Sequence, residues 1–119
     1  MKKRDKSDVI VSSKATIREA IEAIDKNGLL GVFVCDRDGE LVGIVMDKDL
    51  RHAMLSNVDP KASVKIIMKT NPCVVDAGLP YDKRKEELIK SGKILAPVID
   101  EKRCVVDYIF LPEVMDEIY

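Results

Sequence analysis

The chain has 119 residues, of which 46% are hydrophobic, 34% charged and 4% aromatic, a composition typical of one globular domain and not of a disordered segment. Its 20 basic and 21 acidic residues give a net charge of −1, so the chain lacks the basic excess of most nucleic-acid-binding domains. No apolar run approaches the roughly 20 residues of a membrane-spanning helix, and no apolar stretch follows the charged N-terminus as in a signal peptide. We therefore expect neither a nucleic-acid partner nor membrane insertion.

Three cysteines lie far apart in the sequence, each within an apolar run: Cys35, Cys73 and Cys104. An odd number of cysteines with this spacing fits neither a disulfide framework nor a zinc site. We expect buried thiols in a cytoplasmic protein.

The first half of the chain carries signals for a strand, a helix, a hairpin and a second helix. Val9–Val11 predicts a short buried strand, and Thr16–Glu19 has the pattern of a capping box. The helix that follows has an apolar stripe and ends at Gly28, because glycine tolerates a left-handed turn. Two apolar strands then flank a turn at Asp36–Gly39, and Asp47 begins a closing helix. The stripe consists of Ile17, Ala20, Ile21 and Ile24, and the strands are Gly31–Cys35 and Leu41–Met46.

After a short helix expected at Ser63–Met68, the same order of elements returns. Gly28 aligns with Gly92, an offset of 92 − 28 = 64 residues, and no gap is needed from the first strand to the last helix. Several aligned positions keep the same residue: Val11 and Val75, Glu22 and Glu86, Val34 and Val98, Asp36 and Asp100. The chain is therefore a tandem duplication of one unit.

The duplication predicts an α+β (α/β) fold made of two strand–helix–strand–strand–helix units packed about a pseudo-two-fold axis. A unit of about 60 residues is marginally stable alone, and strands that are apolar on both sides need cover on both faces. Two packed units would leave two equivalent clefts as candidate ligand sites. We expect a flexible tail at residues 1–8, repeats at 9–56 and 72–119, and a linker with the short helix at 57–71.

The sequence resembles the CBS-domain pair, or Bateman module, named after cystathionine β-synthase. The resemblance covers nearly all of the chain after residue 8 and rests on Thr16–Ile21, Val32–Asp36, Gly39–Leu50, Val64–Pro72 and Ala96–Asp100. It implies a non-catalytic regulatory module that binds AMP, ADP, ATP or S-adenosylmethionine between the repeats. It also implies a homodimer and an attached or partner catalytic domain. The degenerate second repeat and terminal helix look similar to pairs N-terminal to sugar-phosphate nucleotidyltransferases, whose catalytic domain would lie beyond Tyr119.

The ligand motif of this family, Gly-x-x-Thr/Ser-x-x-Asp, corresponds to Gly43–Asp49 in the first repeat. By resemblance, Asp49 bonds to both ribose hydroxyls and Lys48 meets a phosphate, whereas Met46 replaces the hydroxyl residue. The rest of the predicted first site is Thr16, Gly31 and Val32. Two of these residues also have explanations without a ligand: the helix dipole favours a carboxylate at Asp49, and Thr16 is first a helix cap.

The second repeat carries a degenerate form of this site. Glu113 stands at the Asp position of the motif, Phe110 at the hydroxyl position and Asp107 at the glycine position. Phe110 would fill the adenine space, and Asp107 would repel a phosphate if it faced the cleft. The predicted purine wall of this second site is Leu95, Ala96 and Pro97.

No pattern in the sequence indicates a catalytic residue, a metal site or a required cofactor. Asp36–Gly39 begins like a calcium loop but lacks the later acidic positions, so a hairpin turn explains it. His52 has no neighbouring Cys, Asp or Ser in a nucleophilic or metal-binding arrangement. The alternative to a ligand sensor is a structural or dimerisation module whose clefts are plugged by Met46 and Phe110.

Overall fold

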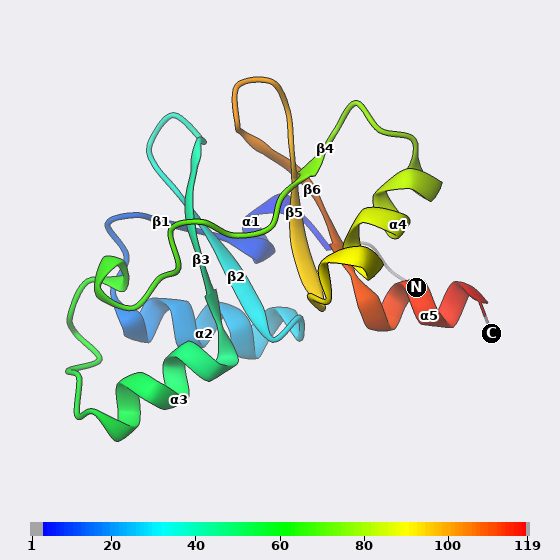
Figure 1. Cartoon of the computed structure of the whole chain (residues 1–119). Helices are drawn as coiled ribbons and strands as arrows, with labels where there is room; N and C mark the ends of the chain where they lie inside the picture. Colours follow the sequence, from blue (N-terminus) through cyan, green and yellow to red (C-terminus); the bar gives the residue numbers. More distant parts are fainter. Residues whose placement is uncertain (1–3, 119) are drawn as a thin grey trace.

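The first half of the chain folds into a three-stranded sheet with helices packed on one face (Figure 1). The computed structural model describes residues 4–118. Strand β2 is central, parallel to β1 and antiparallel to β3. The predicted capping box is present at the start of α2, where Thr16 Oγ1 accepts from the N–H of Glu19 and the Glu19 carboxylate accepts from the N–H of Thr16. The elements are α1 (Lys6–Val9), β1 (Ile10–Ser12), α2 (Ile17–Asn27), β2 (Gly31–Cys35), β3 (Leu41–Met46) and α3 (Asp47–Leu55).

The second half repeats this arrangement after a linker that contains one short 3-10 helix. Its sheet has the order β4-β5-β6, with the same parallel and antiparallel pairings. The registers also coincide, since Gly31 pairs with Met46 just as Leu95 pairs with Phe110. The duplication predicted from the sequence is therefore confirmed in the backbone. The elements are η1 (Val64–Ile66), β4 (Val75–Asp76), α4 (Tyr81–Ser91), β5 (Leu95–Ile99), β6 (Val105–Phe110) and α5 (Leu111–Ile118).

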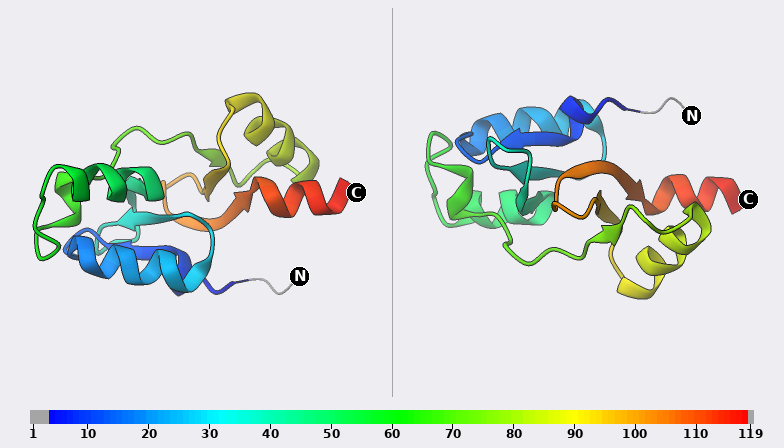
Figure 2. Two further views of the ribbon diagram at one scale, coloured as in Figure 1. Left: turned by 90° about the horizontal axis from the view of Figure 1, so that it is seen from below. Right: turned by 90° about the horizontal axis from the view of Figure 1, so that it is seen from above.

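Three apolar cores hold the molecule together, one between each sheet and its own helices and one between the two sheets. The side chains of β2 alternate between two cores: Val32 and Val34 pack against α2 and α3, whereas Phe33 packs in the core between the sheets. This shared core draws on both repeats and includes Phe33, Leu41, Ile44, Leu95, Ile99, Val105 and Phe110. The two halves are therefore one α+β domain, and Figure 2 shows them side by side, with α2 and α3 toward one end and α4 and α5 toward the other.

The linker returns to the edge of the first sheet before it enters the second repeat. Lys69 and Ile44 exchange backbone hydrogen bonds of 2.8 and 2.9 Å, which dock the linker on β3. Gly43 permits this approach, because a Cβ there would lie 2.7 Å from the Sδ of Met68 and 2.9 Å from the carbonyl oxygen of Lys69. The glycine of the sequence motif thus makes room for the linker.

The N-terminal segment differs from the flexible tail expected over residues 1–8. Residues 1–3 lie outside the described part of the chain, but Lys6–Val9 forms the short helix α1. Val9 is buried in the shared core, and the Asn27 side chain donates a hydrogen bond of 3.0 Å to the carbonyl of Asp8. Burial of Val9 therefore orders this segment, and the first strand begins at Ile10.

The inner face of α4 is more polar than that of α2, and its half-buried arginine, Arg84, has hydrogen-bond and ion-pair partners there. Arg84 donates to the carbonyls of Ala77 and Leu79, both at 2.9 Å, and its guanidinium lies 3.6 Å from the carboxylate of Asp107. Asp107 thus faces α4. The repulsion of a phosphate that was expected from a cleft-facing Asp107 therefore has no basis in this arrangement.

All three cysteines are free thiols, but only Cys35 is buried as expected; Cys73 and Cys104 are partly exposed. Across residues 4–118, no helix has both the length and the apolar character to cross a bilayer. In the same part of the chain, no three His, Cys, Asp or Glu side chains gather where they could hold a metal ion.

Candidate functional site in the first cleft

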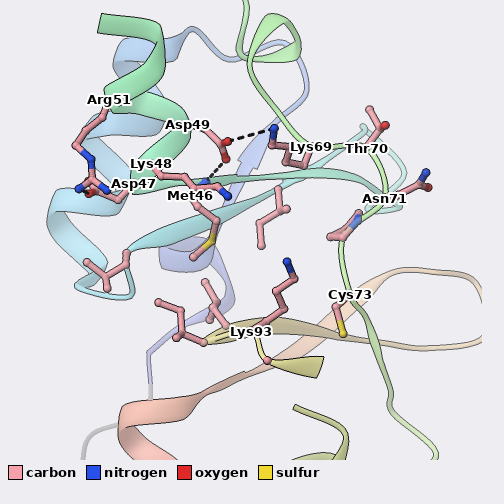
Figure 3. A pocket seen from close by; sticks show the side chains of 16 residues that line it. Met46, Asp47, Lys48, Asp49, Arg51, Lys69, Thr70, Asn71, Cys73 and Lys93 are labelled. Carbon is pink, nitrogen blue, oxygen red and sulfur yellow. Dashed lines mark hydrogen bonds and ion pairs between the residues drawn. The ribbon is translucent and has the colours of Figure 1, made fainter. Parts of the chain in front are cut away.

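A cleft of about 780 Å³ opens where the first repeat, the linker and the second repeat meet (Figure 3). Four segments bound it: the turn before β2, the end of β3 with the first turns of α3, the linker that precedes β4, and the turn between α4 and β5. We call it the first cleft. Its apolar wall consists of Leu30, Ile44, Met46, Ile94 and Leu95, and its polar lining of Asp47, Lys48, Asp49, Arg51, Lys69, Thr70, Asn71 and Lys93.

Asp49 is the buried charge of the first cleft, with 5% of its surface exposed. Its Oδ2 accepts a hydrogen bond of 2.8 Å from the N–H of Met46 and so satisfies a free donor at the start of α3. Its Oδ1 lies 3.8 Å from the Nζ of Lys69. The helix-capping role expected for Asp49 therefore uses Oδ2, whereas the ammonium group of Lys69 lies nearest to Oδ1. A buried carboxylate needs hydrogen-bond partners, and Oδ1 is the oxygen that a hydroxyl donor in the cleft would meet.

Met46 narrows the first cleft without closing it. Its Sδ lies 2.5 Å from where a Cβ on Gly31 would stand, so the thioether lies directly over the backbone of β2. Glycine at position 31 gives the side chain this space. Figure 3 shows Met46 extending into the apolar side of the cleft, away from Asp49. The adjacent cavity remains open, so Met46 does not act as the plug that the alternative hypothesis assigned to it.

Basic side chains surround the buried carboxylate. Lys48 comes from α3, Lys69 from the linker and Lys93 from the turn before β5, and Figure 3 shows Lys93 extending into the cleft. Arg51 is paired with Asp47 at 2.5 Å, whereas Lys48 and Lys93 have no ion-pair partner in the described part of the chain. Four basic and two acidic side chains line the cleft, a net charge of +2. The cleft therefore favours an anionic ligand.

Lys69 and Lys93 were not among the site residues predicted from the sequence. Lys69 reaches the cleft because the linker docks on β3, and no local spacing connects position 69 with Asp49. The usable signal was Gly43, since a glycine in the middle of an apolar strand often marks the close approach of another backbone.

Comparison with known proteins agrees with this geometry. Residues 5–56 match the CBS domain family. Over 93% of its length the chain is 25% identical to a CBS domain-containing protein of Dictyostelium discoideum, of which it covers 84%. It is 29% identical, over 83% of its length, to the arabinose 5-phosphate isomerase GutQ of Shigella flexneri, but spans only 31% of that enzyme.

Solved structures with the same fold extend the match to both repeats. The CBS domain pair of protein MJ0100, in complex with 5′-methylthioadenosine and S-adenosyl-L-methionine, superposes with a TM-score of 0.78 at 24% identity, over 92% of this chain and 86% of the other. CBSX2 in complex with AMP gives a TM-score of 0.76 at 20% identity, over 98% and 91% of the two chains. The chain has the fold of a CBS domain pair.

The first cleft brings together three of the six residues predicted for the first site: Met46, Lys48 and Asp49. The other three do not line it. The Thr16 hydroxyl is used as the cap of α2, Val32 faces the helices on the far side of β2, and Gly31 lies beneath the side chain that passes over it. An apolar strand does not reveal from its sequence which of its faces borders a cleft, and the side chain of Val32 packs on the face toward the helices.

The residues predicted for the second site are dispersed. Leu95 lines the first cleft, Ala96 packs in the core beneath α4, and Pro97 is fully buried. Phe110 packs in the shared core between the sheets. Glu113 accepts a hydrogen bond from the N-terminal segment. Of the two predicted sites, only the first is thus gathered at an open, basic cleft by the residues that the structure describes.

Proposed function

We propose that this CBS pair is a non-catalytic regulatory module that binds an adenine nucleotide in the first cleft and thereby controls an attached or partner catalytic domain. The observation that carries the proposal is the buried carboxylate of Asp49, which presents one oxygen to an open cleft of net charge +2. The functional unit comprises both repeats, 9–56 and 72–119, because the cleft takes residues from each.

The first cleft offers a complementary surface to each part of a nucleotide. The apolar wall that includes Ile44 and Leu95 suits the adenine ring. Asp49 Oδ1 would accept a hydrogen bond from a ribose hydroxyl, and Lys48 and Lys93 would pair with phosphate. Hydrogen bonds to charged groups contribute about 1.5–3 kcal/mol each, so the loss of any one of these contacts should weaken binding measurably.

Charge distinguishes among the adenine ligands. CBSX2 is solved with AMP and MJ0100 with 5′-methylthioadenosine and S-adenosyl-L-methionine, which supports the adenine class as a whole. Within that class, the lysines of the first cleft favour AMP, ADP or ATP. A cleft of net positive charge disfavours the sulfonium of S-adenosylmethionine and gains nothing from the uncharged methylthioadenosine.

Regulation would follow from the position of the first cleft between the repeats. A nucleotide there would contact α3 of the first repeat, the linker at Lys69 and the turn at Lys93 in the second repeat. Because a ligand stabilises the arrangement that it binds best, it would shift the pair toward one relative orientation of its halves. An attached or partner domain would sense that orientation.

A sugar-phosphate enzyme is our candidate for the controlled protein. The isomerase GutQ is similar to this chain over 31% of its own length, which supports the attachment of such pairs to enzymes of sugar-phosphate chemistry. A sugar-phosphate nucleotidyltransferase, expected from the sequence, belongs to the same proposal.

A structural or dimerisation module is the second candidate function. Two observations favour it: Phe110 is buried in the shared core, and Met54 and Leu55 on α3 are 71% and 82% exposed, as a homodimer contact would require. The two functions differ in whether any nucleotide binds, so one titration separates them.

The test is calorimetric titration of the chain with AMP, ADP, ATP, S-adenosylmethionine, methylthioadenosine and GMP. We expect an AMP-class nucleotide to bind once per chain. The Asp49→Asn variant should bind about 10- to 100-fold more weakly, because a charge-assisted hydrogen bond is lost. Its amide oxygen can still accept from the N–H of Met46, so the helix cap is kept. Asp25→Asn is the matched control, because Asp25 is exposed on α2, and it should bind like the unmodified chain.

Absence of heat with every nucleotide at millimolar concentration would favour the structural module. Equal weakening by the Asp25 and Asp49 substitutions would show that Asp49 does not contact the ligand. Tighter binding of S-adenosylmethionine than of AMP would overturn the charge argument while leaving the adenine class intact.

A further inference from the structure

The guanidinium of Arg4 lies against the residues that correspond, in the second repeat, to the ligand-facing residues of the first. Its Nη1 donates to Glu113 Oε1 at 2.6 Å and lies 3.2 Å from the hydroxyl of Tyr108, while its Nε donates to the carbonyl of Asn27 at 2.5 Å. Its Nη2 lies 3.7 Å from where a Cβ on Gly28 would stand. One side chain thus meets four residues, and the acceptors come from α2, β6 and α5.

These acceptors belong to both repeats. Asn27 ends the first helix of the first repeat, whereas Tyr108 and Glu113 belong to the last strand and helix of the second. The arginine therefore bridges the two repeats. It does so at the place that corresponds, under the duplication, to the first cleft. The side chains of Arg4 and Glu113 are 25% and 22% exposed, so the contact is shielded from solvent far more than an ordinary surface ion pair.

The contact between Arg4 and Glu113 corresponds to the contact between Lys69 and Asp49 in the first repeat, but the two differ in distance and geometry. Glu113 aligns with Asp49, and the basic residue that faces each carboxylate comes from the segment that leads into a repeat. Lys69 is 63% exposed and stands 3.8 Å from Asp49, which leaves room for a ligand. The planar guanidinium of Arg4 is in direct contact with Glu113 and donates hydrogen bonds through two of its nitrogens, to Glu113 and to the carbonyl of Asn27. Such a geometry is typical of specific recognition of a guanidinium.

We propose that Glu113, Tyr108 and the carbonyl of Asn27 form a guanidinium-binding site, and that the chain fills this site with its own Arg4. The occupant takes the carboxylate that a second nucleotide would need, so the second repeat is closed to nucleotide by an internal ligand. The same contact fastens the N-terminal segment and α1 across the junction of the two repeats. The site does not depend on nucleotide binding in the first cleft.

The test measures whether a free guanidinium replaces the arginine. Arg4→Ala should lower the melting temperature of the chain by about 5–8 °C, because it removes hydrogen bonds to a charged group and leaves Glu113 without its partner. Arg18→Ala is the matched control: Arg18 forms an ion pair on α2 but is 74% exposed, and its loss should cost less than about 2 °C. In the Arg4→Ala variant, about 20 mM methylguanidinium should restore about 2–3 °C of the loss through binding to the folded state.

The recovery of the melting temperature by methylguanidinium should require the carboxylate of Glu113. Methylguanidinium should leave the double variant Arg4→Ala, Glu113→Gln, the Arg18→Ala variant and the unmodified chain without stabilisation, and methylammonium should restore nothing in Arg4→Ala. The proposal is overturned if Arg4→Ala loses no more than Arg18→Ala, or if methylguanidinium stabilises the single and double variants equally.

A measurement on the unmodified chain covers the case in which Arg4→Ala does not fold. The Nε–H of Arg4 is buried in its hydrogen bond to Asn27, so its proton resonance should exchange with water much more slowly than that of the exposed Arg18. The slow resonance should vanish in Arg4→Lys, which keeps the charge but lacks the planar fork. Arg84, whose Nε also donates to a backbone carbonyl, should keep its slow resonance in that variant. If no slow arginine Nε–H resonance is lost in Arg4→Lys, the site is not occupied in solution and the proposal fails.

Discussion

The two halves of this domain have the same backbone arrangement but differ in the charges around the equivalent carboxylates. In the first repeat, Asp49 lies in a cleft that is also lined by the basic residues Lys48, Arg51, Lys69 and Lys93. The duplication aligns these positions with residues that have no positive charge: Pro112, Met115, Asp5 and Leu29. The carboxylate of the second repeat, Glu113, has Arg4 as its partner instead.

The difference shows what a tandem fold has to keep in both copies and what it can change. Strand pairing and the shared core require the same register and apolar positions in each repeat, and these are retained. The side chains beside each carboxylate carry no such structural demand, so they can diverge. The first repeat has basic residues in the cleft beside its carboxylate, whereas the carboxylate of the second repeat bonds to Arg4.

The largest expected effect tests why the first cleft is open. Gly43→Ala places a methyl group against Met68 and the carbonyl of Lys69, at distances of 2.7 and 2.9 Å, where the backbone of the linker cannot easily move away. We expect a loss of about 1–3 kcal/mol in the free energy of unfolding, as for other overpacked sites, and weaker AMP binding because Lys69 moves. Urea denaturation and calorimetric titration measure the two effects.

Gly78→Ala is the control for this change. Gly78 is exposed, and an added Cβ would meet the movable carboxylate of Asp76 at 3.3 Å, so the cost should stay below about 0.5 kcal/mol. If Gly43→Ala is equally mild and leaves AMP binding intact, the docked linker is not what shapes the first cleft.

A smaller effect tests the shared core between the two sheets, through the dependence of stability on pH. Burial, with a contribution from Asp36, raises the pKa of the Cys35 thiol from 9.0 to about 11. The folded state therefore holds its proton more tightly than the unfolded state does, and stability is constant below pH 9 and falls as the pH rises from 9 toward 11. The loss attributable to Cys35 should reach about 1.4 kcal/mol at pH 10.

Urea denaturation at pH 8 and pH 10 measures this slope, and Cys35→Val should remove it. The aligned position in the second repeat is Ile99, also buried in the shared core, so a β-branched residue suits the strand. Cys104→Ser is the control, because Cys104 is only partly buried. A slope that persists unchanged in Cys35→Val would mean that other groups cause it and that the thiol is not held neutral by the core.

The sequence predicted the repeated parts of this fold well because their signals are local. The capping box at Thr16 and Glu19 needs only a spacing of three residues, and it is present. The alignment of Gly28 with Gly92 transfers every element of the first repeat to the second, and both glycines have the expected left-handed φ, 72° and 71°. Asp49 and Lys48, which were predicted because they belong to a contiguous motif, both line the first cleft.

The contacts that distinguish the two repeats were not predictable in this way. Arg4 meets Glu113 across 109 positions of the chain, and Lys69 reaches its place through a linker that docks on β3. No periodicity in the sequence predicts either the contact of Arg4 with Glu113 or the position of Lys69. The expectation of a tail over residues 1–8 failed for the same reason: a short charged segment reads as solvent-exposed until the acceptors that it meets in the fold are known.

The smallest expected effect tests the charge of the first cleft directly. Lys93→Met keeps the length of the side chain and removes its charge, and it should weaken AMP binding about fivefold, or about 1 kcal/mol, because the side chain is exposed and its attraction to phosphate is screened. Binding of adenosine, which has no phosphate, should change less than twofold. Lys90→Met on the exposed face of α4 is the control and should change neither.

Salt should separate this electrostatic effect from loss of packing. Raising the ionic strength from about 0.05 M to 0.5 M shortens the screening length several-fold, so AMP should bind more weakly to the unmodified chain and the gap between it and Lys93→Met should shrink. If adenosine binding falls as much as AMP binding, Lys93 contributes contact area and the first cleft does not select its ligand by charge. The contrast with the second repeat, where Leu29 stands at the aligned position, would then reduce to the Arg4 contact alone.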